Sequence, residues 1–147
     1  MANKEVLQKL QALSKAQSTR VALYKEFNDA FDDYLADKCP PEQYYSICSI
    51  VTEGFEEVSV EIQSIERDLI DLRKDLAQQI RRLQNIEKEK LHTTAKLQIL
   101  TIEARTGDKD YDATIEQHRQ RLKEILTEIQ EVWDEIREEI TELSYEE

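Results

Sequence analysis

The segment "DKCPPEQ", residues 37–43, is the first strong break in a chain whose other segments have a helical pattern. Two adjacent prolines end the helix before them, and proline also fits the first turn of a following helix. Only two glycines and two prolines occur in 147 residues, so few other positions can stop a helix. The segment "TGDKD", residues 106–110, is the second break, with Gly107 as a left-handed cap. These breaks predict three helices.

Each predicted helix carries apolar residues at alternating spacings of three and four, which is the seam of a coiled coil. The first helix spans about residues 4–37, and its seam is Leu10, Leu13, Tyr24, Phe27, Phe31 and Tyr34, interrupted by Gln17 and Arg20. The second spans about residues 42–105, with Cys48, Val51, Phe55, Val58, Ile62, Ile65, Leu69, Leu72, Leu76, Ile80, Leu83, Ile86, Leu97 and Leu100. The third spans about residues 112–144, with Ile115, His118, Leu122, Ile125, Ile129, Val132, Ile136, Ile140 and Leu143.

The lengths of these helices predict a single all-α domain over residues 1–147, built as elongated antiparallel hairpins. Short connections make neighbouring helices antiparallel, so the first and third helices are expected to fold back on a long central helix. Gly54 is the weak point of the central helix and could kink it. A break within residues 71–78 would instead give a four-helix bundle, but no residue there stops a helix.

The net charge of −12 limits the classes of partner. Residues 106–147 hold fourteen acidic and five basic side chains, for a net of −9, and such a surface repels nucleic acid and anionic membranes. No run of about 20 apolar residues is present, and the N-terminus lacks an apolar signal core, so we expect an intracellular protein without a membrane contact.

Chemistry-bearing residues are sparse. His92 and His118 are far apart in sequence, and Cys39 and Cys48 lack the spacing of a metal site, so neither a metal nor another cofactor is expected. The chain has no glycine-rich phosphate loop and no nucleophile elbow. Its many carboxylate pairs lie on helices that offer no concave pocket for acid–base work. We therefore expect a protein that is not an enzyme.

Aromatic residues gather around the first break, and five of them are candidates for docking a partner: Tyr24, Phe31, Tyr34, Tyr44 and Tyr45. One interpretation is a core that closes the end of a hairpin. The other is an exposed aromatic surface, because tyrosine rings bury area while their hydroxyls stay in water. The sequence leaves both open.

A basic stripe of Arg81, Arg82, Lys88, Lys90 and Lys96 lies within the central helix. The third helix offers acidic residues such as Glu124, Glu131 and Glu138, and opposite charges flanking a seam set the orientation of coiled coils. Pairing between these helices is thus the preferred interpretation of the stripe. Contact with phosphate or with a partner protein is the alternative.

Three segments, residues 10–35, 44–69 and 80–98, together resemble the small Required-for-excision B domain family. The resemblance covers residues 8–100 and extends more loosely beyond them. The most specific pieces are "AQSTRVALY" (Ala16 to Tyr24) and "LQNIEKEKL" through "TAKLQ" (Leu83 to Gln98). The resemblance implies a eukaryotic protein linked to DNA repair, located in the nucleus or cytoplasm. The family has no established catalytic residues, so none is carried over.

These observations predict a non-enzymatic coiled-coil adaptor or scaffold that binds other proteins, themselves helical, in a larger assembly. A strut in a ciliary or microtubule assembly is a rival, and direct nucleic-acid binding through the basic stripe is a less favoured alternative. Self-association is open, because Leu7, Ile70, Leu91, Ile99 and Ile102 lie off the seams.

Overall fold

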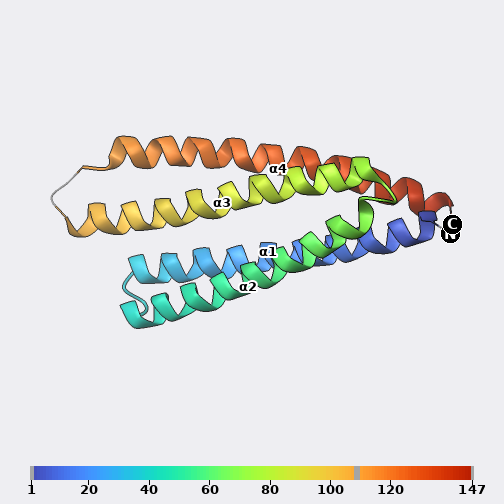
Figure 1. Cartoon of the computed structure of the whole chain (residues 1–147). Coiled ribbons are helices and arrows are strands. Elements are labelled where there is room, and N and C mark those ends of the chain that lie inside the picture. Colours follow the sequence, from blue (N-terminus) through green and yellow to red (C-terminus); the bar gives the residue numbers. More distant parts are fainter. Residues whose placement is uncertain (1, 108–109, 147) are drawn as a thin grey trace. The chain divides into compact units, whose positions relative to one another are not determined.

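A computed structural model describes residues 2–107 and 110–146. All secondary structure in this part of the chain is helical, which confirms the predicted all-α class. Four helices are present: α1 (Ala2–Leu35), α2 (Pro41–Leu69), α3 (Lys74–Thr106) and α4 (Asp112–Glu146) (Figure 1). None of these helices is both long enough and apolar enough to cross a membrane.

The prediction of one continuous helix over residues 42–105 is wrong, because residues 70–73 separate α2 from α3. The amides of Leu72 and Arg73 both donate to the carbonyl of Leu69, at 3.2 and 2.8 Å, and this tightens and ends the helix. The carbonyl of Arg73 then accepts from the amide of Ala77 at 3.1 Å, which begins α3. The break therefore lies where the sequence offers neither proline nor glycine.

Arg73 holds this connection through two carboxylates. Its guanidinium donates to Asp75 at 3.0 and 2.9 Å and to Glu139 of α4 at 2.7 Å. Asp75 lies in the first turn of α3, where the positive end of the helix favours a carboxylate. The Arg73 guanidinium accordingly lowers the pKa of Asp75. The connection is therefore held by charged side chains and contains neither proline nor glycine.

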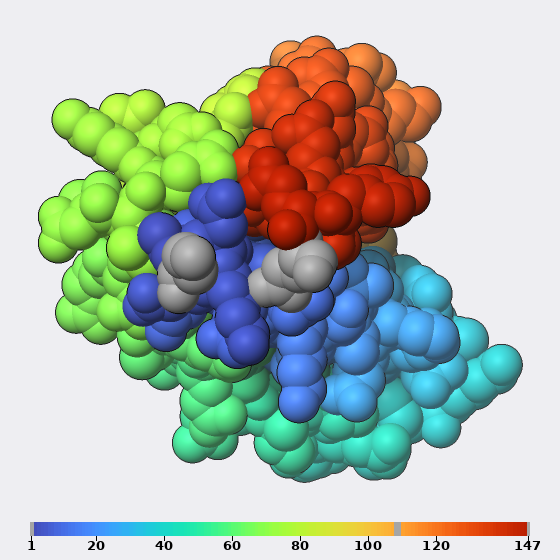
Figure 2. All heavy atoms as spheres, turned by 90° about the vertical axis from the view of Figure 1, so that its right-hand side faces the viewer, coloured from blue at the N-terminus to red at the C-terminus, as the bar shows by residue number. Residues whose placement is uncertain are grey.

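The described chain forms two compact units. The first comprises the described residues of Met1–Gln78 with those of Glu139–Glu147, and the second is Gln79–Glu138. In the first unit the start of α1 meets the end of α4, where Asn3 Nδ2 donates to Glu146 Oε2 at 2.8 Å. Figure 2 shows this end, with α1 in blue beside the end of α4 in red.

α1 and α2 run antiparallel within the first unit (Figure 1). Lys9 Nζ contacts Asp68 Oδ2 at 2.7 Å near one end, and the rings of Tyr24 and Phe55 are 4.6 Å apart nearer the other. The side chains that are fully buried in these helices include Leu10, Leu13, Val51 and Ile62. The polar interruptions Gln17 and Arg20 are also buried, and Arg20 Nη1 donates to Gln17 Oε1 at 3.1 Å.

α3 and α4 run antiparallel within the second unit. Gln79 donates to Glu135, and Arg121 donates to both carboxylate oxygens of Glu89 at 2.6 and 2.7 Å. The buried apolar side chains of this unit are Ile80, Leu83, Leu100, Ile115, Ile125, Ile129, Val132, Trp133 and Ile136. The seam of α3 differs from the prediction, because Glu87, Thr93, Thr94 and Gln98 are buried while Ile86 and Leu97 are half-buried.

Gly54 does not break α2, which is helical through residues 41–69. A Cβ at this position would lie 2.8 Å from Leu23 Cδ2 and 3.0 Å from Leu23 Cδ1. The glycine therefore leaves room for the Leu23 side chain of α1, and α2 stays helical through the position where a kink was expected. Packing between the two helices outweighs the local cost of glycine in a helix interior.

The contact with Leu23 predicts that the effect of Gly54→Ala on the free energy of unfolding depends on the residue at position 23. Alone, we expect the free energy of unfolding to change by less than about 0.5 kcal/mol, since the helix propensity gain of about 1 kcal/mol is offset by the contact with Leu23. In a Leu23→Ala background the same substitution is expected to stabilise by about 1 kcal/mol. Urea unfolding of the unsubstituted protein, the two single variants and the double variant measures both values. Equal stabilisation in both backgrounds would show that the helices are not in contact here.

Candidate protein-docking site

The turn between α1 and α2 is built by the local sequence. The amide of Lys38 donates to the carbonyl of Asp33 at 2.8 Å, and Asp37 has φ of 59°, in the left-handed region that often ends helices. Pro40 is the extended N-cap of α2, and Pro41 is its first residue. The predicted break at the prolines is thus confirmed, with helix ends at Leu35 and Pro41 rather than at residues 37 and 42.

Four aromatic rings cluster at this turn, with Tyr44 at their centre. The Tyr44 ring stacks on Tyr34, with centroids 4.9 Å apart, and lies 5.5 Å from Tyr45 and 6.2 Å from Phe31. Such tilted and offset arrangements suit the charge distribution of aromatic rings. Two turns before Phe31 on α1, Tyr24 pairs with Phe55 and continues the aromatic packing along the hairpin.

The five predicted docking residues differ in exposure. Tyr24 and Tyr44 retain only 6% and 5% of their surface, so both belong to the core that closes the hairpin. Phe31 and Tyr34 are half-buried. Tyr45 remains 57% exposed and is the residue of this group that a partner can reach most freely. The core interpretation therefore applies to two of the five, while docking through the others stays a prediction.

Tyr44 and Cys48 are adjacent on α2 and both stay protonated at neutral pH. Burial is the largest cause that raises the pKa of the Tyr44 hydroxyl, and a hydrogen bond with Cys48 raises it further. Burial also raises the pKa of the Cys48 thiol, although the bond with Tyr44 opposes this shift. A thiol with a raised pKa is a poor nucleophile. Cys48 therefore lacks the environment of a reactive cysteine.

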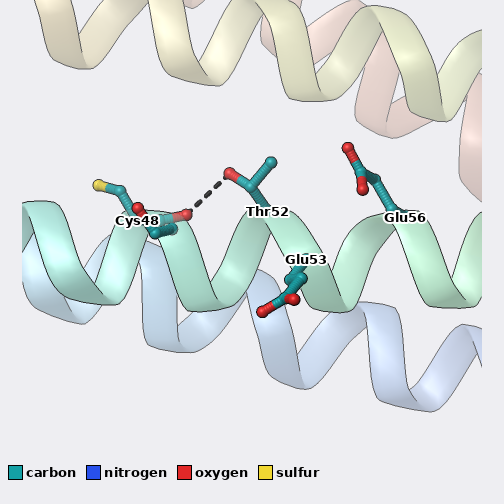
Figure 3. A pocket seen from close by; sticks show the side chains of 5 residues that line it. Cys48, Thr52, Glu53 and Glu56 are labelled. Atoms are coloured by element: carbon teal, nitrogen blue, oxygen red, sulfur yellow. Dashed lines mark hydrogen bonds between the residues drawn. The ribbon is translucent and has the colours of Figure 1, made fainter.

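A shallow hollow of about 330 Å³ lies on α2 beyond the aromatic cluster, lined by Cys48, Ser49, Thr52, Glu53 and Glu56. In Figure 3, Cys48, Thr52 and Glu56 project from the same side of the helix, and Thr52 Oγ1 donates to the Cys48 carbonyl at 2.7 Å. In the described residues no group of three histidine, cysteine or acidic side chains could hold a metal ion. The hollow is open to solvent.

The basic stripe on α3 is mostly exposed: Arg81, Arg82, Lys88 and Lys96 face solvent, and Lys90 is half-buried. The predicted pairing with acidic residues of α4 is not shown for Arg82, Lys88 or Lys96, which form no ion pair with other described residues. Instead, Arg121 of α4 pairs with Glu89 of α3, the opposite assignment of charges. Arg121 accordingly lowers the pKa of Glu89.

The sequence of the described hairpins was compared with known proteins. The model of the family described as DNA repair REX1-B matches residues 8–101. The chain belongs to this family. The REX1-B match confirms the resemblance found from "AQSTRVALY" and "LQNIEKEKL", and it includes the whole aromatic turn and the whole basic stripe.

Two relatives of the REX1-B chain extend this comparison. The heterochromatin silencing protein rss1 of Schizosaccharomyces pombe is 33% identical over 126 residues, which is 86% of this chain and 93% of the relative. The required for excision 1-B domain-containing protein of Bos taurus is 29% identical over 122 residues, which is 80% of this chain and 66% of the relative.

Truncation of the neighbouring residues Tyr44 and Tyr45 in this REX1-B turn is expected to lower the stability of the protein by very different amounts. Tyr44→Ala is expected to destabilise the protein by about 3–5 kcal/mol, because it empties the centre of a ring cluster. Tyr45→Ala is expected to change stability by less than about 0.5 kcal/mol, because its ring is mostly in water. Thermal and urea unfolding of both variants test this. Equal losses would show that both rings belong to the core and that Tyr45 is not a free anchor.

Proposed function

We propose that this protein is a non-enzymatic helical adaptor in a nuclear assembly that acts on DNA or chromatin. One observation carries the proposal. The likeness to a heterochromatin silencing protein covers 93% of that relative, so the relative has little chain outside the matched region. The REX1-B family description, DNA repair, points to the same class of process. A role shared by the two proteins would therefore reside in helical hairpins of this kind.

The hairpins favour binding over catalysis. The apolar side chains of their seams are buried between paired helices, and the hollow on α2 is shallow and open. Catalysis by side chains needs a water-poor pocket in which reacting groups converge. Outer helix faces remain as working surfaces, and the large apolar side chains exposed on them are Val21, Tyr45, Ile50, Val60, Ile99, Leu126 and Tyr145, with Ile70 exposed in the connection between α2 and α3. Such faces support binding to other proteins.

Direct nucleic-acid binding is the second candidate, and the basic stripe is the observation that favours it. Arg82, Lys88 and Lys96 are exposed and form no ion pair with other described residues. The net charge of −12 opposes this candidate, because long-range repulsion weakens every approach to a polyanion. We therefore place the adaptor function first. A ciliary or microtubule host has no comparable support, since neither named relative carries a cytoskeletal description.

Localisation and neighbours in cells test the adaptor function. The full chain, tagged at its own locus, is expected in the nuclear chromatin fraction, and proximity labelling is expected to recover DNA-repair or silencing proteins. A variant with Arg82→Gln, Lys88→Gln and Lys96→Gln should keep both properties, because proteins rather than DNA hold the adaptor. Labelling confined to cytoskeletal or ciliary proteins would contradict the proposal and favour the strut.

Titration with a DNA duplex of about 30 base pairs separates the two candidates. For the adaptor we expect no binding at 0.1 M salt in the range of about 10⁻⁴–10⁻⁶ M that non-specific DNA-binding proteins reach. Binding that weakens steeply with salt, and that the triple glutamine variant abolishes, would instead support the second candidate. Binding that survives in that variant would assign DNA contact to another surface and would also count against the adaptor.

A further inference from the structure

Tyr45 begins a single exposed face of α2. Residues four, seven and eleven positions later lie on the same side of a helix, and these are Ser49, Thr52 and Glu56. All four are exposed, and the last three line the hollow on α2. We call Tyr45, Ser49, Thr52, Glu53 and Glu56 the α2 face. Along the helix axis it is about 17 Å long.

The α2 face combines a flat aromatic surface with carboxylates. One side of the Tyr45 ring rests against Tyr44, with centroids 5.5 Å apart, so the ring is held in place while more than half of its surface stays in water. Glu53 and Glu56 both line the hollow at the other end of this segment, and Figure 3 shows their side chains leaving the helix on different sides. Neither carboxylate has a cation bound to it in the described structure. An anchored ring beside unneutralised carboxylates suits a cationic side chain with a long apolar stem.

The segment that contains the α2 face is also predominantly acidic. Residues 25–57 contain nine acidic and two basic side chains, for a net charge of −7, whereas the whole chain carries −12. One of the two lysines, Lys25, is already paired with Asp29 at 2.7 Å. The turn and the helix ends beside it therefore form one of two strongly acidic segments of the chain, the other being residues 106–147 with a net charge of −9. A field of this sign attracts basic partners and repels nucleic acid.

We propose that the α2 face binds a lysine- or arginine-rich segment of a partner protein. One basic side chain lies with its stem on the Tyr45 ring, and a second places its charge between Glu53 and Glu56 above the hollow. An extended chain advances about 3.3 Å per residue, so about five residues of the partner span the face. The inference rests on the proposed adaptor function and specifies the chemistry of one of its partners.

Fluorescence anisotropy with a defined probe tests the inference. The probe is a labelled 12-residue peptide in which lysine and arginine alternate with alanine and leucine, and a glutamine version of the peptide supplies a neutral reference. At 50 mM salt the full-length chain is expected to bind the basic peptide and not the neutral one. Tyr45→Ala is expected to weaken binding about tenfold, as removal of a central aromatic anchor does.

A charge-matched pair of variants separates a specific site from bulk attraction. Glu53→Lys with Glu56→Lys removes both carboxylates from the α2 face, and Glu131→Lys with Glu138→Lys makes the same change of net charge on exposed residues of α4. We expect at least tenfold weaker binding in the first variant and less than threefold in the second. Helicity by circular dichroism verifies that both variants fold.

Cys48 provides a second readout, because it lines the same hollow. In a Cys39→Ser background, saturating basic peptide is expected to slow alkylation of Cys48 at least threefold, and the neutral peptide to leave the rate unchanged.

Three results would overturn the inference: equal loss of binding in the two charge-reversed variants, absence of binding to the basic peptide, or equal binding of the neutral peptide. Chromatin association of the same full-length chain would remain measurable in each case. The adaptor function could therefore stand while this surface assignment falls, and the two failures are distinguishable.

Discussion

Burial of an apolar seam along the length of each hairpin is the constraint on which the rest of this structure depends. Isolated helices are marginal in water, and most of their stability in proteins comes from packing one face against a neighbour. Here Leu10, Leu13 and Ile62 are fully buried in the first unit, and Ile80, Leu83 and Ile125 in the second. Because these side chains fill the space between paired helices, little interior is left for a reaction. The outer faces of the hairpins are therefore the surfaces on which the proposed function relies.

The seam pattern could be predicted from the sequence, whereas the division of the central helix could not. Leu69 and Leu76 are both buried and continue the spacing of the seam across the connection, so the pattern gives no sign of a break. At this connection Arg73 binds both Asp75 and Glu139. Glu139 is 66 residues away in the sequence, and a contact at that distance has no signature in local propensity. The same limit applies to Gly54, whose role depends on Leu23 of another helix.

The candidate site, too, could be predicted from the sequence only in part. The sequence identified the aromatic turn, because prolines and tyrosines are adjacent there, but it could not assign each ring to core or surface. Tyr44 and Tyr45 are neighbours, yet successive residues of a helix point about 100° apart, and one is buried while the other is exposed. The hollow on α2 was missed altogether, since Ser49 and Thr52 carry no distinctive pattern. Its only signal was the helical spacing from Tyr45 to Glu56, which acquires meaning once exposure is known.

Charge explains why an acidic protein can still belong with DNA-linked proteins. Proteins bind nucleic acid largely because their basic side chains release counterions from the phosphates. The acidic turn of this chain opposes such binding. Proteins that themselves bind nucleic acid carry basic segments, and those segments are what an acidic, aromatic surface attracts. The basic stripe of α3 does not alter this argument, because the chain as a whole carries a net charge of −12. The proposed adaptor, which would contact nucleic-acid-binding proteins and not the nucleic acid itself, is consistent with both the family of this chain and its net charge.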